Sequence, residues 1–186
     1  MTDFLFLRGD WLDKKFTLGL DFPNIPYFKD GDLAITESLA IHRYIADKWK
    51  PELLGSDAQH RAHVSMLSHI INDLKWSIVP DCYGSGDKVH LMQLVHEKMP
   101  PVVKYLGDKK YLTGDQPCWV DFYFFETIQI LIFVSEGSVL ETYPSLKVYN
   151  DNFKQLPGLK EYLATCEDKD MTFNNKSAKI NGKLGF

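Results

Sequence analysis

The order of hydrophobic and polar residues changes at about residue 50. Before that point, apolar residues recur at helix-like spacing between Trp11 and Leu18, and two short strand-like segments follow at Tyr27–Lys29 and Leu33–Ile35. The two segments are separated by Asp-Gly-Asp, and Asp-Gly between short strands is typical of a β-hairpin. The first part of the chain is therefore predicted to mix α and β structure.

A helix is expected to follow the hairpin. Thr36 has a side chain suited to capping a helix, and the apolar pattern continues to about Trp49. In that pattern Ile41, Tyr44 and Ile45 lie on the buried side.

Only helices are predicted after about residue 57. Asp57 can cap a long helix that Pro80 ends, and another helix runs from about Asp87 to Leu106. The segment Trp119–Val134 is apolar on nearly all sides, which is typical of a helix in the middle of a bundle. Two shorter helices are expected at 144–156 and 159–165.

These patterns predict two domains, one over residues 1–50 and an all-helical one over residues 57–186. From about residue 168 the periodicity is lost, and Asn, Lys, Ser and Gly dominate. That end of the chain is expected to be a polar tail, which is either mobile or lies over the bundle.

Composition narrows the choice of partners. The chain has 186 residues and a net charge of −4, which disfavours a nucleic-acid or anionic-membrane partner. Its longest aliphatic or aromatic run, Ile130–Val134, is too short to span a membrane. The three cysteines contain no Cys-x-x-Cys, and no basic segment precedes the apolar residues Phe4–Leu7, so a cytoplasmic protein with free thiols is expected.

Two local patterns have some features of a metal site or a phosphate-binding loop. His60, His63 and His69 lie on one predicted helix, but no Cys or carboxylate accompanies them at ligand spacing, so no metal site is predicted. Residues 84–88 have some features of a phosphate loop but lack its first glycine and the hydroxyl after lysine. Composition and periodicity alone therefore name no reaction.

A resemblance to a known family is more specific. The segment Trp11–Tyr27, the pair Asp30-Gly31 and the segment Ile35–Asp47 resemble the mu class of glutathione transferases, and the likeness continues at lower density to about residue 165. The resemblance implies a thioredoxin-like N-terminal domain, incomplete here, plus an all-α C-terminal helical bundle domain. It also implies an enzyme that conjugates the glutathione thiol to small electrophiles, with glutathione as co-substrate and no cofactor.

The resemblance assigns glutathione-binding roles to residues of the first domain. Trp11 and Lys15 match the pair that holds the glycine carboxylate through an indole N–H and an ammonium, and their spacing of four places them on one helix face. Asn24, Ile25 and Pro26 match the turn in which a cis proline leaves the preceding backbone free to pair with the cysteinyl part of glutathione.

Further matches concern the γ-glutamyl end, the second substrate and the dimer. Ser38, in the first turn of a helix, would offer its hydroxyl and amide to a carboxylate, while Glu37 stands where mu members usually carry Gln and would make an ionic contact with the ammonium. In a homodimer, Asp73 would reach the glutathione ammonium across the interface, and Phe22 would insert into the partner's helical domain. Tyr83 would face the electrophile.

One departure from the family affects a helix cap. Asp121 matches the inner residue of a capping box, but the cap itself is Cys118 instead of Thr or Ser. Sulfur is a weaker acceptor, so we expect the helix to be destabilised by about 1 kcal/mol relative to a threonine cap.

A second departure concerns the start of the chain. The family opens with a strand and a helix, and that strand carries the tyrosine that stabilises the glutathione thiolate, whereas this sequence begins near the family's second strand. The catalytic residue is therefore unassigned. Residues 3–8 would occupy the place of that strand, another chain would fill it, or the sequence is a truncated product. The alternative to an active enzyme is a catalytically weak module used for dimerisation or as a scaffold.

Overall fold

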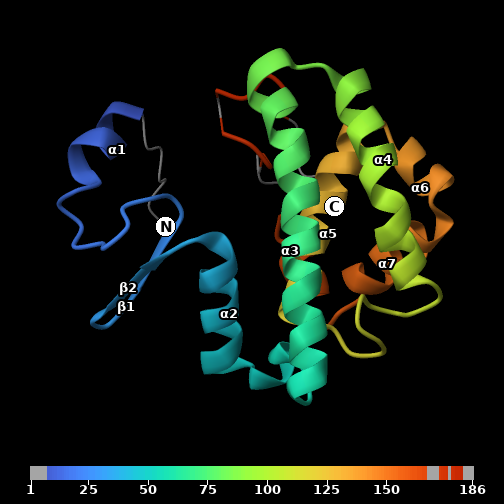
Figure 1. Ribbon diagram of the computed structural model, residues 1–186, viewed down its shortest axis with the longest axis horizontal. Helices are drawn as coiled ribbons and strands as arrows, with labels where there is room; N and C mark the ends of the chain where they lie inside the picture. Colours follow the sequence, from blue (N-terminus) through green and yellow to red (C-terminus); the bar gives the residue numbers. More distant parts are fainter. Residues whose placement is uncertain (1–7, 167–171, 176, 182–186) are drawn as a thin grey trace. The chain divides into compact units, whose positions relative to one another are not determined.

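The computed structural model describes residues 8–166, 172–175 and 177–181. The chain divides into two compact units, residues 1–54 (the N-terminal unit) and residues 55–186 (the C-terminal unit). Figure 1 shows a hairpin followed by a helix in the first unit and a bundle of helices in the second. Residues 3–7, for which the sequence leaves several alternatives open, lie outside the described residues.

The N-terminal unit is built around a two-stranded antiparallel hairpin. Tyr27 lies opposite Thr36 and Asp30 lies opposite Leu33, so the tight turn falls at Gly31, whose φ of 59° suits a glycine. The hairpin predicted from Asp-Gly is therefore confirmed. The elements of the unit are α1 (Arg8–Lys14), β1 (Tyr27–Asp30), β2 (Leu33–Thr36), α2 (Ser38–Trp49) and the 3₁₀ turn η1 (Pro51–Leu54).

The bounds of α1 differ from the prediction. The helix ends at Lys14, because the amide and the hydroxyl of Thr17 both donate to the Lys14 carbonyl and close a turn there. Phe16, which the apolar spacing assigned to the helix, lies beyond its end and is exposed.

The predicted cap of α2 is wrong. Thr36 is still paired in β2, and its hydroxyl donates to the Phe22 carbonyl at 3.0 Å, so Glu37 takes the N-cap position. Ile45, expected on the buried side, is exposed, while Ile41 is buried as predicted.

One carboxylate joins α2 to the hairpin. Asp30, at the end of β1, accepts hydrogen bonds from the Tyr44 hydroxyl at 2.7 Å and from the Lys48 ammonium. The hydrogen bond from Lys48 is the main reason that the pKa of Asp30 lies below its ordinary value. Helix α2, and with it the start of the helix, is therefore attached to the strands.

The C-terminal unit is helical, and its predicted helix ends are mostly confirmed. Asp57 caps α3 by accepting from the His60 amide at 2.9 Å, Asp87 caps α4, and Gly107, with a φ of 52°, ends α4. The elements are α3 (Ala58–Pro80), the π-helical turn η2 (Asp81–Ser85), α4 (Lys88–Leu106), α5 (Trp119–Val134), α6 (Ser138–Thr142), α7 (Pro144–Lys154) and α8 (Leu159–Ala164).

Helix α5 forms the centre of this unit. It packs against α3, α4 and α7, and Figure 1 shows it lying among them. Phe124 and Ile128 are fully buried, and Phe124 meets Tyr149 of α7 with ring centroids 5.3 Å apart. The all-round apolar pattern of α5 is explained by these neighbours on several sides.

A buried carboxylate fixes the start of α5. Asp121 accepts from the Cys118 amide at 2.7 Å, from the Leu112 amide at 2.9 Å and from the Tyr149 hydroxyl at 3.0 Å, so it links α5, the preceding loop and α7. Burial raises the pKa of Asp121 to about 6, although these hydrogen bonds act in the opposite direction. The Cys118 sulfur lies 3.2 Å from the Thr113 hydroxyl.

The described part of the polar tail lies over the bundle. Phe173 meets Phe133 of α5 with ring centroids 5.2 Å apart, and Ile180 is buried. For these residues, the second of the two predicted alternatives is confirmed.

We predict that Cys118→Thr raises the free energy of unfolding by about 1 kcal/mol, because a hydroxyl at the N-cap accepts from the first turn of α5 better than a thiol does. Denaturant unfolding checks this. Cys118→Ala, the control without any acceptor, should bring no gain. A threonine variant no more stable than the wild type would contradict the prediction.

Asp121→Asn is expected to destabilise the chain more at pH 4.5 than at pH 8. The pKa of Asp121 is about 6 in the folded state and 3.8 ordinarily, so protonation favours the folded wild type, and this contribution is lost as pH rises through 6. The variant cannot take up this proton, so the amount by which its free energy of unfolding falls short of the wild type should grow by about 2 kcal/mol at the lower pH. Equal deficits at both pH values would contradict the raised pKa.

Candidate functional site

Several residues that the sequence assigns to glutathione lie together in the N-terminal unit. The Asn24 amide nitrogen donates to Glu37 Oε1 at 3.3 Å, and the Asn24 side-chain oxygen accepts from the Ile25 backbone N–H at 2.9 Å. The Ile25–Pro26 peptide bond is cis, as the resemblance implies. The turn before β1 and the start of α2 therefore form one structure.

The start of α2 lacks a side-chain cap. Glu37, the N-cap residue, has a φ of 72°, and its side chain makes no capping hydrogen bond. The first turn contains no acidic residue, and the Ser38 hydroxyl has no hydrogen-bond partner within the part of the chain that is described. The backbone N–H groups of this turn are therefore available to an anion.

Trp11 and Lys15 have fewer contacts with the other predicted residues of the N-terminal unit. The Trp11 ring stacks on Tyr27, the residue after Pro26, with centroids 6.3 Å apart. The Lys15 amide donates to the Trp11 carbonyl at 2.8 Å, so one helical turn at the end of α1 separates the two residues. The Lys15 ammonium lies 4.8 Å from the Phe16 ring centroid, and within the described part of the N-terminal unit it makes no hydrogen bond to Asn24, Glu37 or Ser38.

Two predicted residues belong to the C-terminal unit. Asp73 is exposed on α3, and among the described residues its carboxylate has no hydrogen-bond partner. Tyr83 lies in η2 and is 38% exposed, and its hydroxyl accepts from the Asn175 backbone N–H at 3.4 Å. No sequence pattern points to Asn175, because the contact uses its backbone N–H and depends on where the tail lies.

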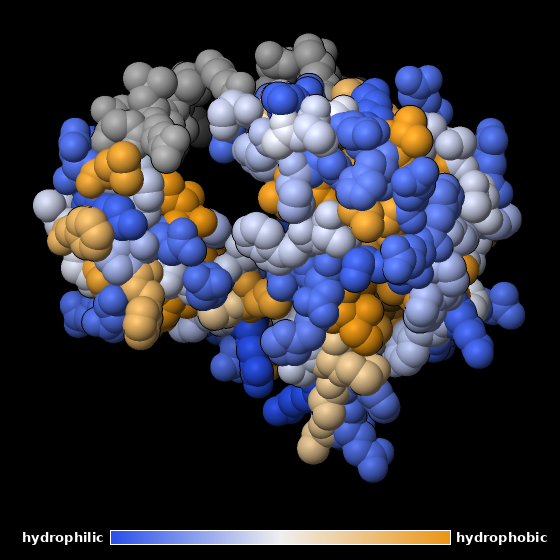
Figure 2. All heavy atoms as spheres, turned by 45° about the horizontal axis from the view of Figure 1, so that its top comes forward, coloured by the Kyte–Doolittle hydropathy of each residue, from blue (hydrophilic) through white to orange (hydrophobic). Residues whose placement is uncertain are grey.

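Phe22, the predicted interface residue, is 80% exposed. Its side chain is therefore not part of its own unit's core. Figure 2 shows other hydrophobic side chains on the surface of the N-terminal unit as well.

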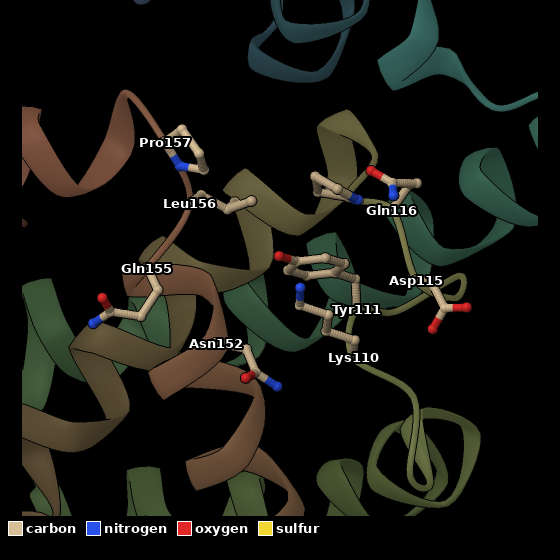
Figure 3. A pocket seen from close by; sticks show the side chains of 9 residues that line it. Lys110, Tyr111, Asp115, Gln116, Asn152, Gln155, Leu156 and Pro157 are labelled. Carbon is tan, nitrogen blue, oxygen red and sulfur yellow. The ribbon is translucent and has the colours of Figure 1, made fainter.

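A separate hollow in the C-terminal unit has a volume of about 280 Å³. It lies between the loop before α5 and the end of α7, as Figure 3 shows, and none of the predicted site residues lines it. Its walls carry a lysine, an aspartate and three amide side chains beside apolar residues: Lys110, Tyr111, Asp115, Gln116, Pro117, Asn152, Gln155, Leu156 and Pro157.

In the described ranges, no group of three or more His, Cys, Asp or Glu side chains is arranged to hold a metal ion. His60, one of the histidines considered above, accepts through Nδ1 from the Ser56 amide at 3.2 Å. No helix of the described residues is both long and apolar enough to cross a membrane.

Comparison with known proteins identifies the class. Residues 6–47 match the family model "Glutathione S-transferase, N-terminal domain", and residues 73–165 match "Glutathione S-transferase, C-terminal domain". The fold is thus a thioredoxin-like domain with a small sheet followed by a helical domain, as the resemblance implies.

Individual relatives agree with this class. The class-mu 26 kDa isozyme 51 of Fasciola hepatica is 34% identical over 185 residues, covering 94% of this chain and 80% of the relative. Glutathione S-transferase Mu 5 of Mus musculus is 34% identical over 181 residues, covering 95% of this chain and 79% of the relative. The chain therefore belongs to the glutathione S-transferase family.

Solved structures show the same fold. The crystal structure of the glutathione S-transferase Blo t 8 superposes with a TM-score of 0.75 at 27% identity, covering 92% of this chain and 82% of that one. A Pi-class glutathione S-transferase of Onchocerca volvulus gives a TM-score of 0.82 at 22% identity, covering 93% of this chain and 84% of that one.

Proposed function

We propose that this protein binds glutathione and conjugates its thiol to small electrophiles, in line with the names of its relatives. The observation that carries the proposal is the uncapped start of α2, where Ser38 lies beside the joined pair Asn24 and Glu37. A helix start without a side-chain cap favours a bound carboxylate. Cytoplasmic detoxification of electrophiles is the role that follows from this proposal.

The charges of glutathione match the proposed ligands. The molecule carries two carboxylates, one ammonium and a thiol. Ser38 and the first amides of α2 bind the γ-glutamyl carboxylate, and the carboxylate of Glu37 binds the neighbouring ammonium. Trp11 and Lys15 bind the glycine carboxylate at the other end of the tripeptide.

The remaining assignments concern the cysteinyl part and the second substrate. The backbone carbonyl of Ile25, before Pro26, pairs with the cysteinyl part of glutathione, while the Ile25 N–H is held by the Asn24 side chain. Tyr83, partly exposed in η2, faces the electrophile. Tyr44 donates its hydroxyl to Asp30, and Tyr27 lies in β1, so neither is assigned the role of stabilising the thiolate.

A homodimer completes the proposed site. Phe22 is exposed in its own chain, as a residue that inserts into a partner subunit must be. Asp73, exposed on α3, then contacts the glutathione ammonium bound by the partner.

Lys15→Ala and Ser38→Ala are each expected to weaken glutathione binding by about tenfold or more, the scale for losing a charge-assisted hydrogen bond. Isothermal calorimetry on the full chain measures this. Lys14→Ala, one residue from Lys15 and exposed, is the matched control and should bind like the wild type. Equal affinities for all four proteins, or no binding by the wild type, would overturn the proposed site.

The wild type is expected to be a dimer at micromolar concentration, and Phe22→Ser is expected to shift it to a monomer because the inserted ring is lost. Light scattering distinguishes the two states. Phe16→Ser is the matched control, because Phe16 is 78% exposed in the same unit and has no proposed role at the interface. A monomeric wild type, or a dimeric Phe22→Ser variant, would contradict the proposed interface.

A further inference from the structure

The π-helical turn η2 leaves one backbone carbonyl available. In an α-helix the Gly86 amide would donate to the Cys82 carbonyl, four residues earlier. Here the Gly86 amide donates instead to the Asp81 carbonyl at 2.8 Å, five residues earlier. The Cys82 carbonyl accepts hydrogen bonds from two backbone amides near the end of the chain, that of Lys179 at 2.8 Å and that of Ile180 at 3.1 Å. The π geometry is thus what allows the tail to attach at this point.

The attached residues, 172–175 and 177–181, are called the C-terminal segment here. Its shape is fixed internally, because the Asn174 amide nitrogen donates to the Ile180 carbonyl at 2.8 Å. Ile180 is buried, so the attachment is apolar as well as hydrogen-bonded. The same segment places the Asn175 N–H 3.4 Å from the Tyr83 hydroxyl.

Asp81 holds the turn in this geometry. Asp81 is 6% exposed, with Oδ1 accepting from the Ser85 hydroxyl at 2.6 Å and Oδ2 accepting from His90 Nδ1 at 2.8 Å. The Ser85 oxygen in turn accepts from the Asp87 amide at 3.0 Å. The carboxylate therefore connects the first residue of η2 with its last residue and with the first turn of α4.

The charge on Asp81 strengthens this connection. The hydrogen bond from Ser85, assisted by the one from His90, holds the pKa of Asp81 below its ordinary value despite burial. The group is ionised at neutral pH, and hydrogen bonds to an ionised acceptor are stronger than neutral ones. Removing the charge should therefore loosen the turn more than removing one neutral hydrogen bond would.

We infer that Asp81 is a positioning residue for the second-substrate site: through Ser85 and His90 it holds the π turn, whose Cys82 carbonyl anchors the C-terminal segment beside Tyr83. Asp81 contacts neither substrate. The inference rests on the proposed function for the role of Tyr83, whereas the coupling between Asp81 and the C-terminal segment stands on the contacts alone.

Asp81→Asn tests the inference by amide hydrogen exchange, measured by NMR on the full chain. The Asn175, Lys179 and Ile180 amides are expected to exchange about tenfold faster or more, because one of the two charge-assisted bonds is lost. Asp87→Asn is the matched control: it removes the carboxylate that caps α4, two residues after η2, but Asn caps a helix as well as Asp does, so these amides should exchange as in the wild type.

Gly86→Ala releases the C-terminal segment by another route. Gly86 has a φ of 74°, and an added Cβ would lie 3.2 Å from the Lys179 Cβ. This variant leaves the Asp81 side chain intact and should accelerate exchange at the same three amides. It therefore shows the exchange pattern of a detached segment, against which Asp81→Asn is compared.

Steady-state kinetics supplies the second readout. In Asp81→Asn the KM for a chlorodinitrobenzene-type electrophile is expected to rise about threefold or more, while the KM for glutathione stays unchanged, a split that general loss of stability would not produce. Unchanged exchange at the three amides, or equal changes in both KM values, would overturn the inference. If the wild type neither binds glutathione nor turns over, the proposed function fails, and exchange alone decides whether Asp81 anchors the segment.

Discussion

Every helix start needs hydrogen-bond acceptors for its first amides, and the described helices meet this need in different ways. The first amides of a helix have no hydrogen-bond partner within it. In α3 and α4, Asp57 and Asp87 accept hydrogen bonds from amides of the first turn, and in α5 Asp121 accepts one from the amide of the N-cap residue. At the start of α2 no side chain does so, and Glu37 has backbone angles that favour glycine. Among α2, α3, α4 and α5, α2 is the helix whose start makes no backbone hydrogen bond to a side chain, and the proposed ligand site lies there.

The rest of the structure makes this open helix start usable. Asp30 fixes α2 to the hairpin, and Asn24 joins the turn before β1 to Glu37, so the proposed binding groups at the start of α2 are linked to the hairpin by hydrogen bonds. In the C-terminal unit, the buried links of Asp121 hold α5 in the bundle, and Asp81 holds the turn that carries Tyr83. Buried carboxylates with complete sets of hydrogen bonds therefore provide much of the rigidity that the site needs.

Much of this fold could be predicted from the sequence, because its signals are local. Asp-Gly marks the hairpin, Asp57 and Asp87 mark helix starts, and the apolar run of α5 marks a central helix. The errors arise where tertiary contacts decide: Thr36 is retained by β2 and cannot cap α2, and the π turn depends on the buried Asp81. The contact of Asn175 with Tyr83 could not be predicted, because it joins a backbone amide to a side chain 92 residues away.

The central claim is that the start of α2 binds the γ-glutamyl carboxylate of glutathione, and one NMR titration tests it directly. The chain, labelled with ¹⁵N, is titrated with glutathione and separately with the dipeptide Cys-Gly, which lacks that carboxylate. A saturable shift of the Ser38 amide resonance is expected with glutathione, and none at the same concentrations of Cys-Gly. Equal shifts with both compounds, or an unperturbed Ser38 amide at saturating glutathione, would contradict it.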